Sequence, residues 1–295
     1  MIDLLESLNL IDRSSVVEIS PKVRDREDVK VLKCPRSGII FLSRSDHIQQ
    51  AFYESKAKCL PSTDGTHVEL TLDDRLVKIP FPKDAIRRET DFGDHITGKR
   101  WLDVGTGYGG TLDRLASKAE TVVGVEPNHR QRSHVQKKGY EVYASIDDLQ
   151  NKTFDVITLF HVFEHFIQPT ETLAQLRRHL IPGGIVIIEV PHARDFLLHT
   201  LECDRFKDYA FWSEHLILHT RKSLETFIQA ASFQDITVEG CQRFPLSNHL
   251  HWLARQQPGG HEIWAYMNTK DIRLAYFNLL QSLDQTDTLI AFAKG

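Results

Sequence analysis

The sequence predicts an α/β protein, a three-layer α/β/α sandwich on a mostly parallel sheet of about seven strands. Between residues 86 and 192, short apolar, β-branched runs such as TVVGVE and GIVIIEV alternate with segments of helical pattern. That alternation is typical of a parallel sheet covered by helices on both faces. The earliest of these runs, RWLDVG, leads directly into a glycine-rich turn, VGTGYGG, and a helical pattern follows the turn. Such a turn is expected where a doubly wound sheet binds a ligand at its strand ends.

The patterns along the chain divide it into four segments. Residues 1–85 are irregular with strand-like runs such as VKVLKC and GIIFLS, so we expect a small β-rich cap. Residues 86–244 carry the strand and helix alternation and form the ligand-binding core. Residues 245–288 are rich in aromatic residues and histidine, which predicts an insertion that serves as a lid or an interface. Residues 289–295, in the run DTLIAFAKG, supply the last core strand, antiparallel to its neighbours.

Composition limits the classes of partner. The 295 residues include 36 Lys and Arg against 40 Asp and Glu, so the formal net charge is −4. This balance argues against a general nucleic-acid or anionic-membrane surface. The four cysteines form no C-x-x-C pair, so neither a structural zinc site nor a disulfide framework is expected. No run approaches the roughly 18 apolar residues of a spanning helix, and we expect a cytoplasmic protein.

The glycine-rich turn is the most informative stretch. Gly105, Gly107 and Gly110 satisfy the spacing G-x-G-x-x-G, and Glu126 ends the next strand 21 residues after Gly105. Glycines allow positive φ and close approach of a ligand, and the helix that follows presents free N–H groups. An acid at that distance holds ribose hydroxyls in nucleotide-binding sheets. The pattern fits a nicotinamide enzyme and an adenosylmethionine enzyme equally, and a tight turn without a ligand is the alternative.

Four motifs in this order carry a family resemblance: LDVGTGYGG, VVGVEPN, FDVITLFHVFEHF and LRRHLIPGGIVIIEVP. Over residues 86–235 they resemble the motifs of class I S-adenosylmethionine-dependent methyltransferases of the type 11, 12 or 23 group, which are related to sugar C-methyltransferases. The resemblance implies a Rossmann-like fold and S-adenosyl-L-methionine as cofactor.

The resemblance also implies roles for particular residues. Asp103 and the glycine turn would hold the methionine part of the cofactor, and Glu126 would bind the ribose. The segment Ser145-Ile146-Asp147 would lie beside the adenine, and the backbone of Phe160 and His161 would form the floor of the pocket. The implied cofactor-binding set is Asp103, Gly105, Thr106, Gly107, Tyr108, Gly109, Glu126, Pro127, Ser145, Ile146, Asp147, Phe160 and His161.

A second motif competes with this assignment. His161-Val-Phe-Glu164-His165 spells H-x-x-E-H, the signature of a class of zinc metalloproteases. That chemistry needs both histidines on one continuous helix, whereas the apolar pattern of residues 154–160 predicts a buried strand that ends at His161. We therefore predict no metal site, and expect His161 or His165 to line the acceptor site. A structural histidine at a helix start is the alternative for His165.

The stretch Phe211-Trp-Ser-Glu214-His215 supplies the expected catalytic residues. It resembles the Glu-His element of sugar C-methyltransferases, which implies that His215 acts as a general base and that Glu214 orients it or binds an acceptor hydroxyl. Trp212 stands where those relatives have tyrosine, and a structural ion pair is the alternative. Cys34 stands in a segment that looks like a degenerate form of their four-cysteine zinc module. The predicted catalytic set is His215, Glu214 and His165.

These inferences combine into one predicted function. We expect a methyltransferase acting on a small polar acceptor such as a sugar, nucleotide-sugar or glycan building block, in carbohydrate biosynthesis. No nucleic-acid or membrane partner is expected, and a homodimer is left open. Two alternatives remain at this point: an NAD-dependent oxidoreductase that uses the same glycine turn, and a non-catalytic subunit that keeps the fold.

Overall fold

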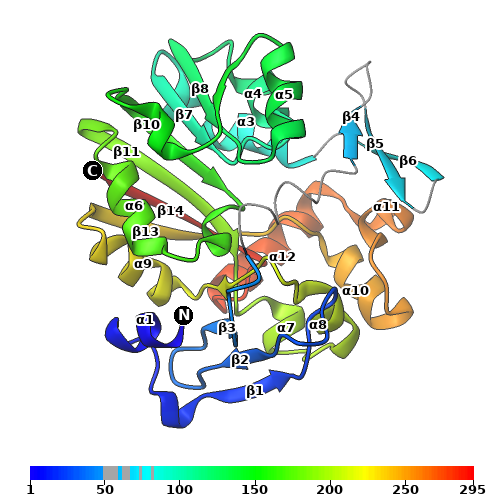
Figure 1. The fold of residues 1–295 in the computed structure, drawn as a ribbon. Coiled ribbons are helices and arrows are strands. Elements are labelled where there is room, and N and C mark those ends of the chain that lie inside the picture. Colours follow the sequence, from blue (N-terminus) through cyan, green and yellow to red (C-terminus); the bar gives the residue numbers. More distant parts are fainter. Residues whose placement is uncertain (49–58, 62–66, 73–74, 81–82) are drawn as a thin grey trace. The chain divides into compact units, whose positions relative to one another are not determined.

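The computed structural model describes residues 1–48, 59–61, 67–72, 75–80 and 83–295 (Figure 1). Its largest sheet has seven strands in the order β13-β14-β11-β10-β7-β8-β9. The strands are β7 (Arg100–Val104), β8 (Thr121–Val125), β9 (Glu141–Tyr143), β10 (Phe154–Phe160), β11 (Leu180–Pro191), β13 (Gln234–Cys241) and β14 (Thr288–Lys294). The four strands from β10 to β9 pair in parallel. The predicted fold class is confirmed, and the place of β14 between β13 and β11 is consistent with an antiparallel last strand.

The register of the parallel strands fixes where their carboxyl ends lie. Val104 pairs with Val125, and Asp103 pairs with Thr158. Strand β10 is buried along almost its whole length, as expected for a central parallel strand. The residues that follow β7 and β8, Gly105 and Glu126, therefore emerge at the same edge of the sheet.

The chain divides into two compact units. The first, here the cluster unit, contains Met1–Ser45, His161–Thr172 and Ile188–Ala293. The second, here the turn unit, contains the ranges Asp46–Phe160, Leu173–Ile187 and Lys294–Gly295. The predicted boundaries at residues 85, 244 and 288 thus differ from the boundaries of the two compact units. The predicted segments stay predictions about the role of each part of the chain.

The turn unit contains the glycine turn and the helices near it. Helix α3 (Lys83–Ile96) packs against α4 (Gly110–Leu115), and α5 (His129–Lys137) follows β8. A separate antiparallel sheet is formed by β4 (Cys59–Pro61), β5 (His67–Leu72) and β6 (Arg75–Pro80). The turn-prone residues 62–66 of the predicted cap lie outside the described residues.

The cluster unit joins the start of the chain to its last third. Its sheet is formed by β1 (Val17–Ser20), β2 (Val31–Lys33), β3 (Ile40–Leu42) and β12 (Ile217–Leu218). Strand β12 follows directly after the predicted catalytic stretch, and Ile217 pairs antiparallel with Phe41 of β3. The first 45 residues therefore share a sheet with a segment that lies far away in sequence.

Helices fill most of the rest of the cluster unit. The segment predicted as an insertion, residues 245–288, is mostly helical. Its helices are α10 (Leu246–Arg255), α11 (Gly260–Ile263) and α12 (Lys270–Ser282). The preceding helices of this unit are α7 (Phe196–His199), α8 (Asp204–Ala210) and α9 (Arg221–Ala230). Among the described residues, no helix combines the length and apolarity that crossing a bilayer requires.

Candidate active site

The glycine turn is a tight bend that begins helix α4. Gly105 and Thr106 both donate their backbone N–H to the carbonyl of Val125, at 2.7 and 3.2 Å. Gly109 has a φ of 79°, and a Cβ there would lie 3.2 Å from a methyl group of Val135. Glycine is required at this position because the left-handed conformation and the close neighbour both disfavour a side chain. The turn leaves the N-terminal N–H groups of α4 available to a ligand.

The carboxylate of Glu126 lies against the glycine turn. Its Oε2 accepts a hydrogen bond from the Gly107 N–H, and its Oε1 accepts one from the Asn128 N–H, both at 2.8 Å. The residue is only 5% exposed. Burial raises the pKa of Glu126 to about 7, although these hydrogen bonds and Arg132 favour the ionised form. The structure thus brings together the two parts of the predicted nucleotide-binding pattern.

Asp103 is a buried carboxyl on β7. Thr158 donates its hydroxyl to Asp103 Oδ1 at 2.6 Å and accepts the indole N–H of Trp101 at 2.9 Å. Burial raises the pKa of Asp103 to about 6, against the opposing effects of the Thr158 hydrogen bond and the Arg88 charge. Asp103 and Glu126 are therefore two carboxyls that burial holds close to protonation at neutral pH.

The remaining turn-side candidates have varied surroundings. Thr106 is buried, and Tyr108 meets the ring of His134 edge-on at 5.8 Å. The carbonyl of Pro127 accepts a hydrogen bond from Arg132 Nη1 at 2.9 Å. Phe160 stacks on Phe92 with ring centroids 5.1 Å apart. The roles predicted for these residues stay predictions.

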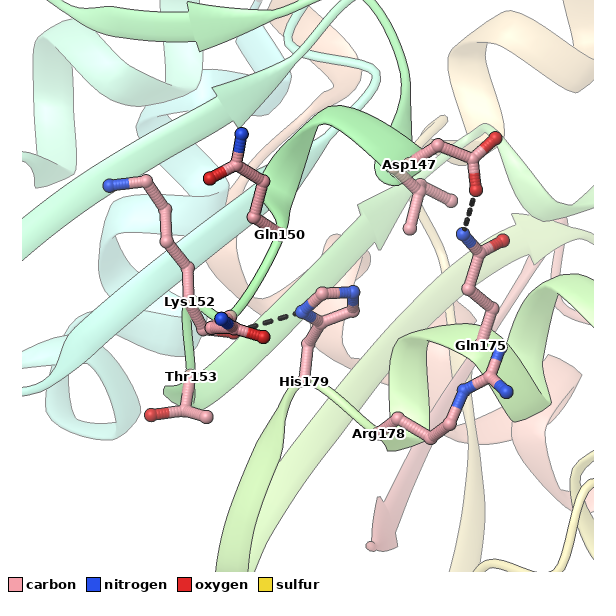
Figure 2. A pocket seen from close by; sticks show the side chains of 9 residues that line it. Asp147, Gln150, Lys152, Thr153, Gln175, Arg178 and His179 are labelled. Atoms are coloured by element: carbon pink, nitrogen blue, oxygen red, sulfur yellow. Dashed lines mark hydrogen bonds between the residues drawn. The ribbon is translucent and has the colours of Figure 1, made fainter.

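The expected adenine-side segment forms a short 3-10 helix, η2 (Ile146–Leu149), that Ser145 caps. Asp147 Oδ1 accepts a hydrogen bond from Gln175 Nε2 at 2.5 Å. Asp147 and Ile146 line a polar cavity of about 440 Å³ (Figure 2). The other residues that line it are Gln150, Asn151, Lys152, Thr153, Gln175, Arg178 and His179. Asp147 is thus already engaged by a side chain of α6 (Pro169–Arg177).

The H-x-x-E-H stretch does not lie on a continuous helix. Strand β10 ends at Phe160, and Phe163–His165 form a single 3-10 turn, η3. His161 has a φ of 56°, a left-handed conformation that few non-glycine residues adopt. The helical arrangement of the zinc metalloproteases is therefore absent from this described stretch.

Glu164 lies at the centre of a buried group of acids and histidines, here called the histidine cluster: His161, Glu164, His165, Glu189, Glu214 and His215. Glu164 Oε1 lies 3.4 Å from His161 Nδ1 and 3.7 Å from His165 Nε2. Burial disfavours the charge on Glu164, but the neighbouring His161 and His165 hold its pKa well below its usual range. The sequence motif includes Glu164. That Glu164 lies at the centre of the cluster could not be predicted from sequence, because this depends on how side chains pack.

The predicted catalytic residues belong to this cluster. His165 Nδ1 lies 3.7 Å from Glu214 Oε2, and the rings of His165 and His215 are 5.3 Å apart. Burial, reinforced by the charge of His165, lowers the pKa of His215 to about 4. His215 is therefore neutral at physiological pH and carries a lone pair. The structure brings His165, Glu214 and His215 together, while their catalytic roles stay predictions.

His215 also lines a cavity of about 470 Å³ in the cluster unit. Its aromatic wall contains Phe206, Tyr209 and Trp252, and the Trp252 ring lies 5.3 Å from Phe206 and 5.2 Å from Tyr209. The lining residues with polar side chains are His192, Asp195, His215, Arg243, Asn248, His249, His261 and Asp287. The sequence indicated Trp252 within an aromatic stretch, but gave no sign that α8 and α10 face one cavity.

Two acids in the lining of this cavity were missed by the sequence analysis. Burial raises the pKa of Asp195 to about 8, with a further contribution from the charge of Asp287. Asp287 accepts the backbone N–H groups of Arg243 and Phe244 at about 3 Å. Asp195 is recognisable in sequence only as the cap of the short helix α7, where it accepts the N–H of Leu197 at 2.7 Å.

The start of the chain holds the predicted catalytic stretch in place. Asp25 Oδ1 accepts the backbone N–H of Ser213 at 3.0 Å, and Oδ2 accepts the Ser213 hydroxyl at 2.7 Å. The indole N–H of Trp212 donates to the same Oδ2 at 2.9 Å. The guanidinium of Arg24 lies 4.2 Å from the Trp212 ring. Trp212, the departure from the sugar C-methyltransferase pattern, is thus a structural anchor.

Comparison with known proteins agrees with this fold. A crystal structure titled as a SAM dependent methyltransferase from Archaeoglobus fulgidus matches with a TM-score of 0.50 at 16% identity, covering 72% of this chain and 93% of that one. A tRNA U34 carboxymethyltransferase of Dichelobacter nodosus is 36% identical over 112 residues, which are 35% of this chain and 36% of the relative. A ubiquinone biosynthesis O-methyltransferase of Pasteurella multocida is 31% identical over 110 residues, 31% of this chain and 46% of the relative. The chain spans less than half the length of these two curated relatives.

These relatives correct the expected partners. Three of the matching proteins bear the name tRNA U34 carboxymethyltransferase, so the expectation that excluded nucleic acid is wrong. The relatives' names refer to tRNA and to ubiquinone biosynthesis, in place of the sugar or nucleotide-sugar acceptor that we expected. The expected cofactor, S-adenosyl-L-methionine, is confirmed at the level of the family. A family profile described as a methyltransferase domain matches residues 80–238, more than half of the sequence, and the chain therefore belongs to this methyltransferase family.

Proposed function

We propose that this chain transfers a methyl group from S-adenosyl-L-methionine to an acceptor that presents a planar aromatic ring. The observation that carries the proposal is the 470 Å³ cavity lined by His215 and by the aromatic side chains of Phe206, Tyr209 and Trp252. Aromatic walls favour stacking of a flat ring, and a cavity of this size suits a small ligand or one base of a larger one.

The turn unit has the chemistry that the cofactor requires. Glu126 would accept hydrogen bonds from the ribose diol, and the N–H groups at the start of α4 would face the carboxylate of the methionine part. Asp103, which is buried beside Thr158, would face the positively charged end of the cofactor. The rest of the turn, together with Ser145-Ile146-Asp147 and Phe160, would complete the pocket.

The cluster unit has groups that can take the acceptor proton. In the proposed reaction the carbon–sulfur bond of the sulfonium breaks as a bond forms between the methyl carbon and an oxygen or nitrogen of the ring. The acceptor loses its proton to neutral His215, and S-adenosylhomocysteine leaves. His165 and Glu214 would hold the base in position. The sulfonium is already a good leaving group, so alignment of the two reactants supplies most of the rate enhancement.

A phenol and a uracil share this acceptor chemistry, because each is a flat ring with an ionisable O–H or N–H. The relatives named for ubiquinone biosynthesis and for tRNA U34 make both sources relevant. Methyl-labelled cofactor should be incubated with the full chain and three acceptors: a catechol, unmodified tRNA, and a sugar nucleotide without a free phenol. We expect transfer to the catechol or to tRNA. Faster transfer to the sugar nucleotide through its sugar hydroxyls would overturn the ring proposal.

A matched pair of variants locates the acceptor. Trp252→Ala removes one aromatic wall of the cavity, whereas Tyr266→Ala changes a ring that is 79% exposed in the same unit. A stacked ring contributes roughly 1–3 kcal/mol, so we expect Trp252→Ala to raise the acceptor KM by about tenfold. Equal KM values for the two variants would place the acceptor elsewhere. Titration with S-adenosylhomocysteine and NAD in parallel tests the cofactor, and binding of NAD alone would favour the oxidoreductase alternative.

A further inference from the structure

Glu164 has surroundings that are unusual for a buried carboxylate. Its side chain is 0% exposed, and neither oxygen has a hydrogen-bond partner within the described part of the chain. The nearest histidine nitrogens, on His161 and His165, lie at ion-pair distances of 3.4 and 3.7 Å. A buried carboxylate is costly unless its charge is well compensated. The two histidines compensate the Glu164 charge when they are protonated, and a cation close to Glu164 would supply that compensation when they are neutral.

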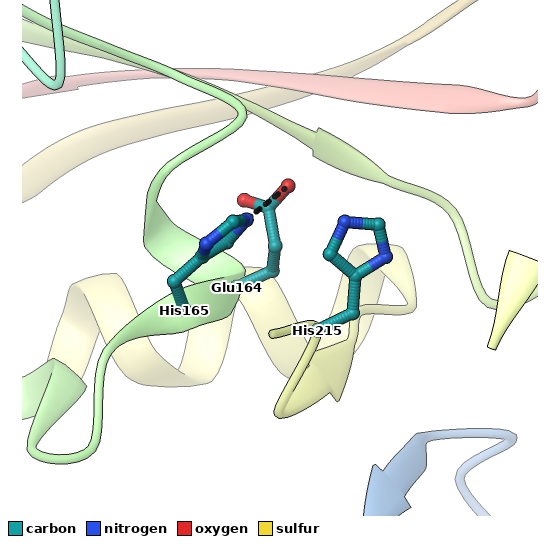
Figure 3. Close-up of side chains that lie close together, drawn as sticks. All are labelled: Glu164, His165 and His215. Carbon is teal, nitrogen blue, oxygen red and sulfur yellow. Dashed lines mark ion pairs between the residues drawn. The ribbon is translucent and has the colours of Figure 1, made fainter. Parts of the chain in front are cut away.

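Two imidazoles lie close enough to share such a cation. Glu164, His165 and His215 each offer one ligand atom, and these atoms all lie within 4.8 Å of one another. Figure 3 shows the Glu164 carboxylate between the two imidazole rings. Ligands bound at roughly 2.0–2.2 Å lie at most about 4.4 Å apart, so small side-chain rotations close the site.

The outer contacts of the cluster have the arrangement that holds metal ligands in proteins. The Nε2 atom of His165 faces Glu164, while its Nδ1 atom lies 3.7 Å from Glu214. A carboxylate on the second ring nitrogen fixes the orientation and tautomer of a ligating histidine. His161 lies between Glu164 and Glu189, with its Nε2 atom 3.0 Å from Glu189 Oε1. Glu214 and His161 would therefore position the ligands without binding the ion.

The geometry points to a site for one divalent transition-metal ion that is bound by Glu164, His165 and His215. Two imidazoles and one carboxylate suit zinc, cobalt, manganese or iron better than calcium or magnesium, which prefer oxygen ligands. Three protein ligands leave one position of a tetrahedral ion open for a fourth ligand. With the ion bound, His215 would be a ligand and would not take the acceptor proton, so the metal site is an alternative to proton transfer by His215. The site is independent of the proposed acceptor.

Titration of the chelator-treated full chain with Co²⁺ tests this site without any assay of activity. We expect one ion per chain, with the visible absorption bands of cobalt bound by nitrogen and oxygen. Glu164→Gln and His215→Asn should each weaken binding by about 100-fold, and Glu214→Gln by about tenfold as an outer partner. His199→Gln, a half-buried histidine of the same unit outside the cluster, should bind as the unaltered chain does.

Circular dichroism of each variant establishes that it is folded, and two different ligand variants guard against misfolding of either one. Absence of stoichiometric cobalt binding by the unaltered chain would overturn the metal site. So would equal affinity in folded Glu164→Gln, His215→Asn and His199→Gln. Either result leaves proton transfer by His215 in place, while cobalt binding without methyl transfer would contradict the proposed function alone.

Discussion

The glycine turn and the histidine cluster are both buried, and burial disfavours charge in both, but the two regions differ in the groups on which burial acts. In the turn unit, burial raises the pKa values of Asp103 and Glu126 to about 6 and about 7. In the cluster unit, burial lowers the pKa of His215 to about 4, whereas the neighbouring histidines keep the carboxyl of Glu164 ionised. The turn is therefore suited to a ligand that brings donors and positive charge, and the cluster offers lone pairs and negative charge.

The comparison predicts that the largest effect on turnover comes from the cluster. His215→Asn should lower kcat by about 100-fold, since it removes either a base or a metal ligand. The dissociation constant of S-adenosylhomocysteine should stay unchanged, because that ligand is assigned to the turn. Single-turnover kinetics and calorimetry measure the two quantities. If His215→Asn also weakened cofactor binding, the assignment of turnover to the histidine cluster and of cofactor binding to the glycine turn would be wrong.

The second prediction concerns the turn. Glu126→Gln keeps the shape of the side chain but removes the charge that accepts the Gly107 and Asn128 N–H groups. Hydrogen bonds to a charged group contribute roughly 1.5–3 kcal/mol, so we expect S-adenosylhomocysteine to bind about 10- to 100-fold more weakly. Glu120→Gln, at an exposed position of the same unit, is the control. Equal affinity of the two variants in calorimetry would remove Glu126 from the ribose site.

The third prediction uses pH. Because burial raises the pKa of Glu126 to about 7, the carboxyl is mostly protonated at pH 6 and ionised at pH 8. Ribose hydroxyls donate best to the ionised form, so cofactor affinity should rise by up to about tenfold between these pH values. Calorimetry across this range measures the effect. The rise should be missing in Glu126→Gln, and an identical profile in that variant would assign the titration to another group.

The smallest expected effect belongs to the N-terminal anchor. Asp25→Ala removes three acceptor contacts with Trp212 and Ser213, next to Glu214 and His215. We expect kcat to fall several-fold while cofactor affinity is retained, because the change loosens only the stretch that is predicted to be catalytic. Asp28→Ala, which removes surface ion pairs with Arg26 and Arg44, is the matched control. Steady-state kinetics measure the loosening, and thermal unfolding measures any general loss of stability. Equal kcat values in the two variants would show that Asp25 has no positioning role.

The same two regions explain what could be predicted from sequence. The turn is one strand, one bend and one helix in succession, with Glu126 at the end of the next strand, so its parts are readable from local pattern. The cluster depends on packing between segments that are far apart: Asp25 and Ser213 are separated by 188 positions. Periodicity carries no record of such pairings, which is why the cavity, the place of Asp195 and the anchoring of Trp212 were missed.

Strand β12 has only two residues, and its partner is β3 near the start of the chain. The backbone beside His215 is further tied to that region, because the Leu42 N–H donates to the Leu216 carbonyl at 3.0 Å. Chimeras that graft the acceptor side of this protein onto a related scaffold must therefore transplant the first 45 residues as well. An exchange of the late segment alone would leave its histidine without the template on which it folds.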